Sequence, residues 1–144
     1  MSPATRPGLT TAAGLATLER ALVVLIAVHS LVVGLFLVFA TDWGARFGGF
    51  PSPVPLFFPR QAGAFHFVVA AIYLVEYLHH RGVGLLVMTK SIAVVFLFLT
   101  VLLDSVPWVV PLSGVGDGLM AAAVVLLRRT RGLPLLGPGP GGRP

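Results

Sequence analysis

The chain has 144 residues, 56% of them hydrophobic and only 10% charged, and its mean hydropathy is +0.95. Soluble domains carry roughly 25% charged residues, so this composition excludes a large soluble domain. It predicts an all-α integral membrane protein, an antiparallel bundle of four transmembrane helices of about 20 residues each. The net charge of +5 comes from arginines at helix ends and in the tail, which does not indicate nucleic-acid binding. The absence of cysteine excludes disulfides and thiol-based metal or redox sites.

The N-terminal residues 1–18 are small, polar and interrupted by proline and glycine, which predicts a flexible tail. The first span is expected over residues 21–40, a run without formal charge that contains His29. A cleavable signal peptide is the alternative, with residues 38–40 as the cleavage site. The apolar run is longer than the roughly 7–15 residues of a signal core, which favours the span.

Residues 41–60 form the only long connection between spans. Their prolines disfavour a regular helix, and their aromatic side chains suit an anchor in the headgroup region. A lid over the bundle is the alternative.

The remaining spans are expected over residues 61–78, 83–103 and 108–127. The turn HHRG at residues 79–82 joins the second and third spans into an antiparallel hairpin. Residues 132–144 are so rich in glycine and proline that we expect a disordered tail. Residues 19–131 would therefore form one four-helix membrane domain.

The distribution of arginines predicts the orientation of the chain. Seven fall on the side of the bundle that holds both termini and the 79–82 turn, and two, Arg46 and Arg60, fall on the other side. Cytoplasmic segments of membrane proteins are enriched in Lys and Arg. We therefore expect a multi-pass protein of the cell inner (plasma) membrane with both termini in the cytoplasm.

Several polar residues lie inside the expected spans, where lipid cannot solvate them, and six of them are candidates for a functional site. They are His29, His66, Tyr73, Glu76, Lys90 and Asp117. Three of them, on the second span, share one stripe of a helix with 3.6 residues per turn. We expect the six to line a polar cavity that binds a ligand.

Glu76 and Lys90 lie on either side of the 79–82 turn, at depths that differ by about 5 Å. Pairing across the hairpin would offset the cost of burying either charge alone. In the alternative, Lys90 reaches the headgroups and Glu76 reaches interfacial water.

His29, His66 and Asp117 are expected to share a second polar level if their three helices face one another. A hydrogen-bonded core without chemistry is one alternative there, and a zinc or iron site is another. No metal is expected, because no local ligand motif such as His-x-x-x-His is present.

The short four-span plan carries three local features: Arg60-Gln-Ala-Gly63 opening the second span, Lys90 early in the third, and Asp117-Gly118 in the fourth. Together these resemble the DoxX-like superfamily of small four-span bacterial membrane proteins, over roughly residues 20–128. The resemblance implies a helical bundle and, for some members, association with quinone-linked or thiol-linked redox systems. Because this chain has no cysteine, we expect no resident cofactor, with a quinone as the alternative.

Our main functional prediction is a small membrane protein without autonomous catalysis that binds a hydrophobic ligand or a partner subunit in the polar cavity. One alternative is a membrane enzyme on a lipid-soluble substrate, an isomerase or quinone-linked oxidoreductase, with His66 or Glu76 as the proton carrier. Another is a small oligomeric or proton-coupled transporter that depends on Glu76 and Asp117. The expected partners are the lipid bilayer, a hydrophobic small molecule, and a second copy or another membrane subunit; no nucleic acid is expected.

Overall fold

The structure is a computed structural model that describes residues 7–52 and 55–137, with side chains from residue 12 onward. This part of the chain forms five helices and no strand. They are α1 (Pro7–Phe39), α2 (Thr41–Phe47), α3 (Phe57–His80), α4 (Gly84–Leu103) and α5 (Val109–Thr130). All except the short α2 are long and apolar enough to cross a membrane. The chain is an all-α integral membrane protein, as its composition predicts.

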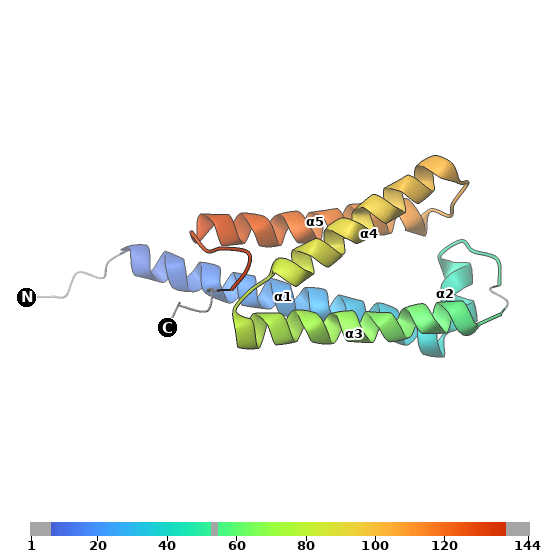
Figure 1. Cartoon of the computed structure of the whole chain (residues 1–144), viewed down its shortest axis with the longest axis horizontal. Coiled ribbons are helices and arrows are strands. Elements are labelled where there is room, and N and C mark those ends of the chain that lie inside the picture. The colour runs from blue at the N-terminus through green and yellow to red at the C-terminus, as the bar shows by residue number, and fades with distance from the viewer. Residues whose placement is uncertain (1–6, 53–54, 138–144) are drawn as a thin grey trace, which may run out of the picture.

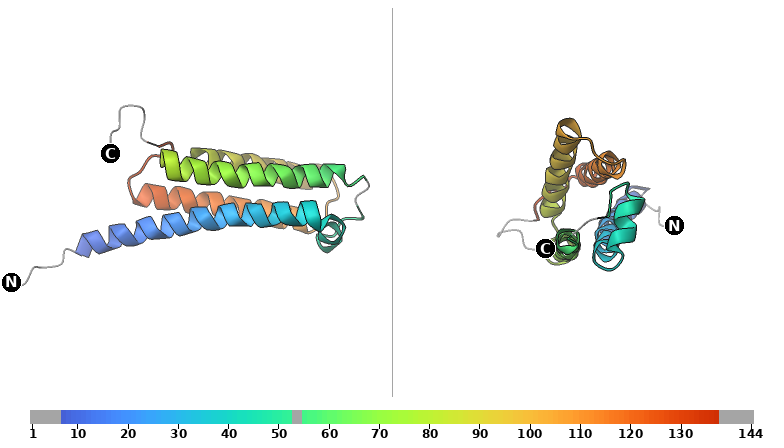
Figure 2. Two further views of the ribbon diagram at one scale, coloured as in Figure 1. Left: turned by 90° about the horizontal axis from the view of Figure 1, so that it is seen from below. Right: turned by 90° about the vertical axis from the view of Figure 1, so that its right-hand side faces the viewer.

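The four long helices form an antiparallel bundle built from two pairs. α1 packs along α3 and α4 packs along α5, whereas the two pairs contact each other less. The α3–α4 turn, the start of α1 and the end of α5 lie at one end, which we call the turn end (Figure 1). α2 lies at the opposite end, which we call the α2 end. α4 begins beside the end of α3 and slants away from it toward the α2 end (Figures 1 and 2).

α1 starts earlier than expected. Residues 7–18 are helical, where the sequence predicted a flexible tail; residues 1–6 of that tail lie outside the described residues. Pro7 occupies the first helical position. Its fixed φ favours a helix start there, and proline's lack of an N–H costs nothing, because an N–H at this position would have no acceptor within the helix. No proline occurs between residues 7 and 51, so the helix runs without a break into the first span.

The connection between the first two spans contains α2, which the proline content did not predict. The prolines begin only at residue 51, so Thr41–Phe47 retains all its backbone N–H groups. Asp42 accepts a hydrogen bond from the Ser52 hydroxyl at 2.6 Å and pairs with Arg46 at 2.9 Å. The hydrogen bond from the Ser52 hydroxyl, and to a smaller extent the contact with Arg46, lowers the pKa of the Asp42 carboxyl below its ordinary value.

Aromatic side chains join α2 to both neighbouring segments. Trp43 stacks on Phe36 of α1 and on Phe47 of its own helix, and Phe47 meets Trp108 edge to face. Trp108 directly precedes α5, so this cluster links the connection of the first pair of helices to that of the second.

The segment after α5 folds back over the α3–α4 turn. The Val83 N–H, which precedes α4, donates to the Leu135 carbonyl at 2.7 Å, and the Leu136 side chain covers Gly84. A disordered tail was expected from residue 132, but residues 132–137 are placed, because they supply an acceptor to an N–H that the helix leaves unpaired. Residues 138–144 of that predicted tail lie outside the described residues.

α1 and α3 approach most closely at a pair of glycines. A Cβ added to Gly34 would lie 2.9 Å from the Gly63 carbonyl oxygen, and one added to Gly63 would lie 2.8 Å from the Gly34 carbonyl oxygen. Small residues permit such backbone contact between membrane helices. The large apolar side chains of the four helices are mostly exposed on the outside of the bundle, as contact with lipid requires.

Candidate functional site

A cavity of about 280 Å³ lies between α3 and α4, with contributions from α1 and α5. Its volume is close to the lower end of the range for small-molecule sites, roughly 300–1,000 Å³. Its lining residues are Ser30, Ala62, Phe65, His66, Val69, Tyr73, Thr89, Lys90, Ala93 and Asp117. Four of the six predicted site residues therefore meet at one cavity: His66, Tyr73, Lys90 and Asp117. The other two, His29 and Glu76, lie elsewhere.

Lys90 and Asp117 form an ion pair between α4 and α5. The Lys90 Nζ lies 2.5 Å from Asp117 Oδ1, and the two side chains are 6% and 15% exposed. The pairing of Lys90 with Glu76, which equal depth suggested, is wrong: Lys90 pairs with Asp117 of α5, and Glu76 bonds to the backbone of α4. The reason is the helix packing, because α4 lies along α5 and meets α3 only near the turn.

Glu76 instead caps the start of α4. Its two carboxylate oxygens each accept a hydrogen bond from the Leu85 N–H at 3.0 Å, and one also accepts from the Leu86 N–H at 3.3 Å. A carboxylate at a helix N-terminus satisfies unpaired N–H groups and interacts favourably with the helix dipole. The residue that precedes α4, Val83, has no side chain able to cap. The sequence GVG at residues 82–84, which lacks any local cap, was the signal that the cap comes from elsewhere.

His66 and Tyr73 each carry a buried polar atom that has no hydrogen-bond partner among the described residues. The His66 Nδ1 and the Tyr73 hydroxyl oxygen are both buried without a hydrogen bond in the described part of the chain. Thr89 lies near the Tyr73 hydroxyl across the cavity, but the two do not reach hydrogen-bond geometry. Buried polar atoms are nearly always hydrogen-bonded, so two such atoms in one cavity point to a ligand or solvent that satisfies them.

His29 does not line the cavity; its neighbour Ser30 does. His29 is exposed on the surface of α1, whereas Ser30 is 1% exposed. The buried positions of α1 follow helical spacing through Glu19, Val23, Ile26 and Ser30, and His29 falls outside this stripe. The helical spacing of these positions is the signal in the sequence that favours Ser30 over His29 as the inward-facing residue.

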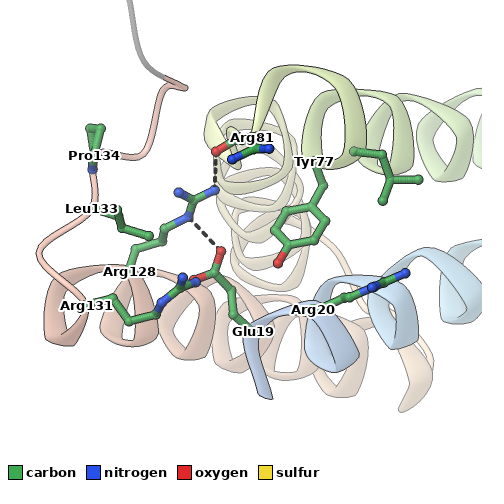
Figure 3. Close-up of a pocket in the computed structure, with 9 residues that line it drawn as sticks. Glu19, Arg20, Tyr77, Arg81, Arg128, Arg131, Leu133 and Pro134 are labelled. Carbon is green, nitrogen blue, oxygen red and sulfur yellow. Dashed lines mark hydrogen bonds and ion pairs between the residues drawn. The ribbon is translucent and has the colours of Figure 1, made fainter. Parts of the chain in front are cut away.

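Sequence reasoning also missed a buried ion-pair network at the turn end. Glu19, close to the start of the first expected span, is 1% exposed. Its carboxylate lies 3.0 Å from the Arg128 Nε and also pairs with Arg131 (Figure 3). The Arg128 Nη2 donates to the Arg81 carbonyl oxygen at 2.6 Å. The network joins α1 and α5 to the α3–α4 turn.

Within the described residues, no three His, Asp or Glu side chains lie close enough together to hold a metal ion. No family model, curated protein or solved structure matches this chain. The fold and the cavity therefore define its class on their own: a four-helix integral membrane protein with a polar cavity between two of its spans.

Proposed function

We propose that the protein binds one lipid-soluble molecule that carries a hydrogen-bonding head group, in the cavity between α3 and α4. The observation that carries this proposal is the convergence of the Lys90–Asp117 ion pair with two unpartnered polar atoms, His66 Nδ1 and the Tyr73 hydroxyl. Ionisable groups inside a membrane are costly and are concentrated where they serve a ligand, an ion or a proton.

The lining specifies the chemistry of the ligand. Lys90, Tyr73 and Thr89 are donors that a carbonyl or hydroxyl oxygen can use, and Asp117 accepts from a hydroxyl. The apolar lining residues, Phe65 and Val69 among them, suit a ring or chain. A quinone-like or lipid-like molecule with an oxygen-bearing head fits this description.

The membrane and the orientation belong to the same proposal. Arginines at the turn end, Arg20, Arg81 and Arg129 among them, outnumber the two at the α2 end, Arg46 and Arg60. This supports a location in a bacterial inner membrane with the turn end and both termini in the cytoplasm. The resemblance to DoxX-like proteins is part of the proposal too; Lys90 and Asp117, two of the residues that carry it, are the ion pair of the cavity.

The test is extraction of the protein from its native membrane under mild conditions, followed by mass spectrometry of small molecules that remain bound. We expect one compound near equimolar ratio in the wild type. His66→Asn and Tyr73→Phe should each weaken retention by about threefold to tenfold, the effect of one hydrogen bond. His29→Asn is the matched control, because it alters an exposed histidine at similar depth. Absence of a bound compound in the wild type, or equal loss in the control, contradicts the proposal.

His66 also favours a second candidate, a membrane enzyme that moves a proton on a lipid-soluble substrate. Its Nδ1 is buried without a hydrogen bond in the described part of the chain, and the residue lines the cavity, where a general base is needed. Glu76, the other proton carrier considered, is occupied by the cap of α4. The test is turnover of a quinone or isoprenoid substrate. Loss of this turnover in His66→Ala, with the fold intact and the ligand still bound, would favour catalysis over binding alone.

A further inference from the structure

A second pocket, of about 600 Å³, lies at the turn end of the bundle and shares no lining residue with the polar cavity. It is formed by the start of the membrane-spanning part of α1, the last turns of α3 and α5, and the segment that follows α5 (Figure 3). Four arginines line it, Arg20, Arg81, Arg128 and Arg131, against a single carboxylate, Glu19. The pocket is therefore strongly electropositive.

Glu19 neutralises only part of this charge. It is shared between Arg128 and Arg131, while Arg20 and Arg81 have no ion pair in the part of the chain that the structure describes. The Arg128 Nε lies 3.0 Å from the Glu19 carboxylate but outside hydrogen-bond geometry, so this buried donor is not fully satisfied within the chain. An anion that reaches the pocket would meet Arg128 and Arg131, whose guanidinium groups Glu19 already holds in place.

The pocket is rigidly built. Arg128 is 4% exposed, and it holds the carbonyl oxygen of Arg81 at 2.6 Å. Arg81 itself adopts the left-handed conformation, with φ of 53°, which a non-glycine residue adopts only when its surroundings enforce it. The Arg128 contact therefore helps to fix the backbone that carries a second arginine of the pocket.

The walls are amphipathic. Tyr77 and Leu78 of α3 line the pocket beside the arginines, at the level where the spanning helices end. Guanidinium groups bind phosphate oxygens in bidentate geometry, and arginine-lined pockets at the ends of membrane helices suit phosphate head groups of lipids.

We propose that this pocket binds a phosphate-bearing anion, supplied by an anionic lipid head group or by a soluble phosphate ester. Arg20 and Arg81 contact the phosphate directly, and Arg128 and Arg131, fixed by Glu19, form the positive floor. The assignment is independent of the function proposed for the cavity, because the two pockets use different residues.

The experiment uses the full chain in uncharged detergent, titrated with phosphatidylglycerol and followed by native mass spectrometry. Phosphatidylcholine is the zwitterionic control lipid, and glycerol 1-phosphate is the soluble phosphate ester. The test variants are Arg20→Gln, Arg81→Gln and their combination. The matched control is Arg129→Gln, which removes the same charge from an exposed residue at the same end that lines neither pocket.

We expect phosphatidylglycerol to bind more tightly than phosphatidylcholine, and each test variant to weaken its binding about tenfold, as for loss of a charged hydrogen bond. Arg129→Gln should leave binding unchanged, and Arg20→Lys with Arg81→Lys should bind more tightly than the glutamine variants, because the lysines keep the charge but lose the bidentate geometry. These lysine variants also test the proposal if the glutamine variants fail to fold. If glycerol 1-phosphate displaces the lipid, the site is assigned to soluble phosphate esters. If it does not displace the lipid, the site is assigned to the lipid head group. Equal binding of the two lipids, or equal weakening by Arg129→Gln, overturns the proposal.

Discussion

Lys90 and Asp117 show how one buried charge depends on another. Each side chain would be unfavourable alone inside the bundle, and their ion pair offsets part of the desolvation of both. The pair also fixes two cavity-lining groups in one geometry, beside His66 and Tyr73, whose buried polar atoms have no hydrogen bond in the described part of the chain. A residue pair that stabilises the fold thus also shapes the site.

We predict that Lys90→Met and Asp117→Leu each lower the free energy of unfolding by about 3–5 kcal/mol, because each leaves an uncompensated buried charge. The double variant should recover most of this loss, since it buries no charge. Unfolding of the purified protein in detergent micelles, followed by circular dichroism, measures the effect. Arg46→Gln, which breaks an exposed ion pair in α2, is the control and should change stability far less. A double variant no more stable than either single variant would contradict the pairing.

At the scale of elements, a helix that lacks a hydrogen-bond partner at its end obtains it from a neighbouring segment, and small residues let two helices pack closely. α4 has no capping residue of its own, and Glu76 of α3 supplies the carboxylate. The N–H of Val83 finds its acceptor at Leu135, which follows α5. α1 and α3 approach closely because both carry glycine at the crossing, Gly34 and Gly63.

Gly63→Val should destabilise the α1–α3 pair by about 1–3 kcal/mol, because its side chain would overlap with the backbone of α1. Gly116→Ala is the matched control: no atom lies within 4 Å of its added Cβ. Removing a helical glycine there should leave stability unchanged or raise it by about 0.5–1 kcal/mol. The same unfolding measurement compares the two variants. If both have equal stability, the glycine crossing is not a tight contact.

The whole molecule is polarised between its two ends. The turn end carries the buried Glu19–Arg128–Arg131 network and most of the arginines, and the α2 end carries the aromatic cluster around Trp43. Arginine favours the cytoplasmic face, whereas aromatic residues occur at both interfaces. The proposed orientation therefore rests on the arginines alone.

The absence of native cysteine permits a direct test of orientation by labelling single cysteines in whole cells. We predict that an impermeant maleimide labels Phe50→Cys, near α2, in intact spheroplasts. Thr130→Cys, at the end of α5, should react only after the membrane is permeabilised. Both native side chains are exposed, so accessibility within the fold is equal. The reverse labelling pattern would place the turn end outside the cell.

The sequence by itself determined the membrane class, the four spans and the alternation of their directions, because hydropathy and helix length are properties of local segments. It also identified four residues of the cavity lining, His66, Tyr73, Lys90 and Asp117, since polar side chains inside spans are conspicuous. Helix packing decided the partners: α4 lies along α5, so Lys90 meets Asp117 and not Glu76. It also decided that Ser30, and not His29, faces inward. Depth along a helix can be counted from the sequence, but the rotation of each helix toward its neighbours depends on contacts between all four.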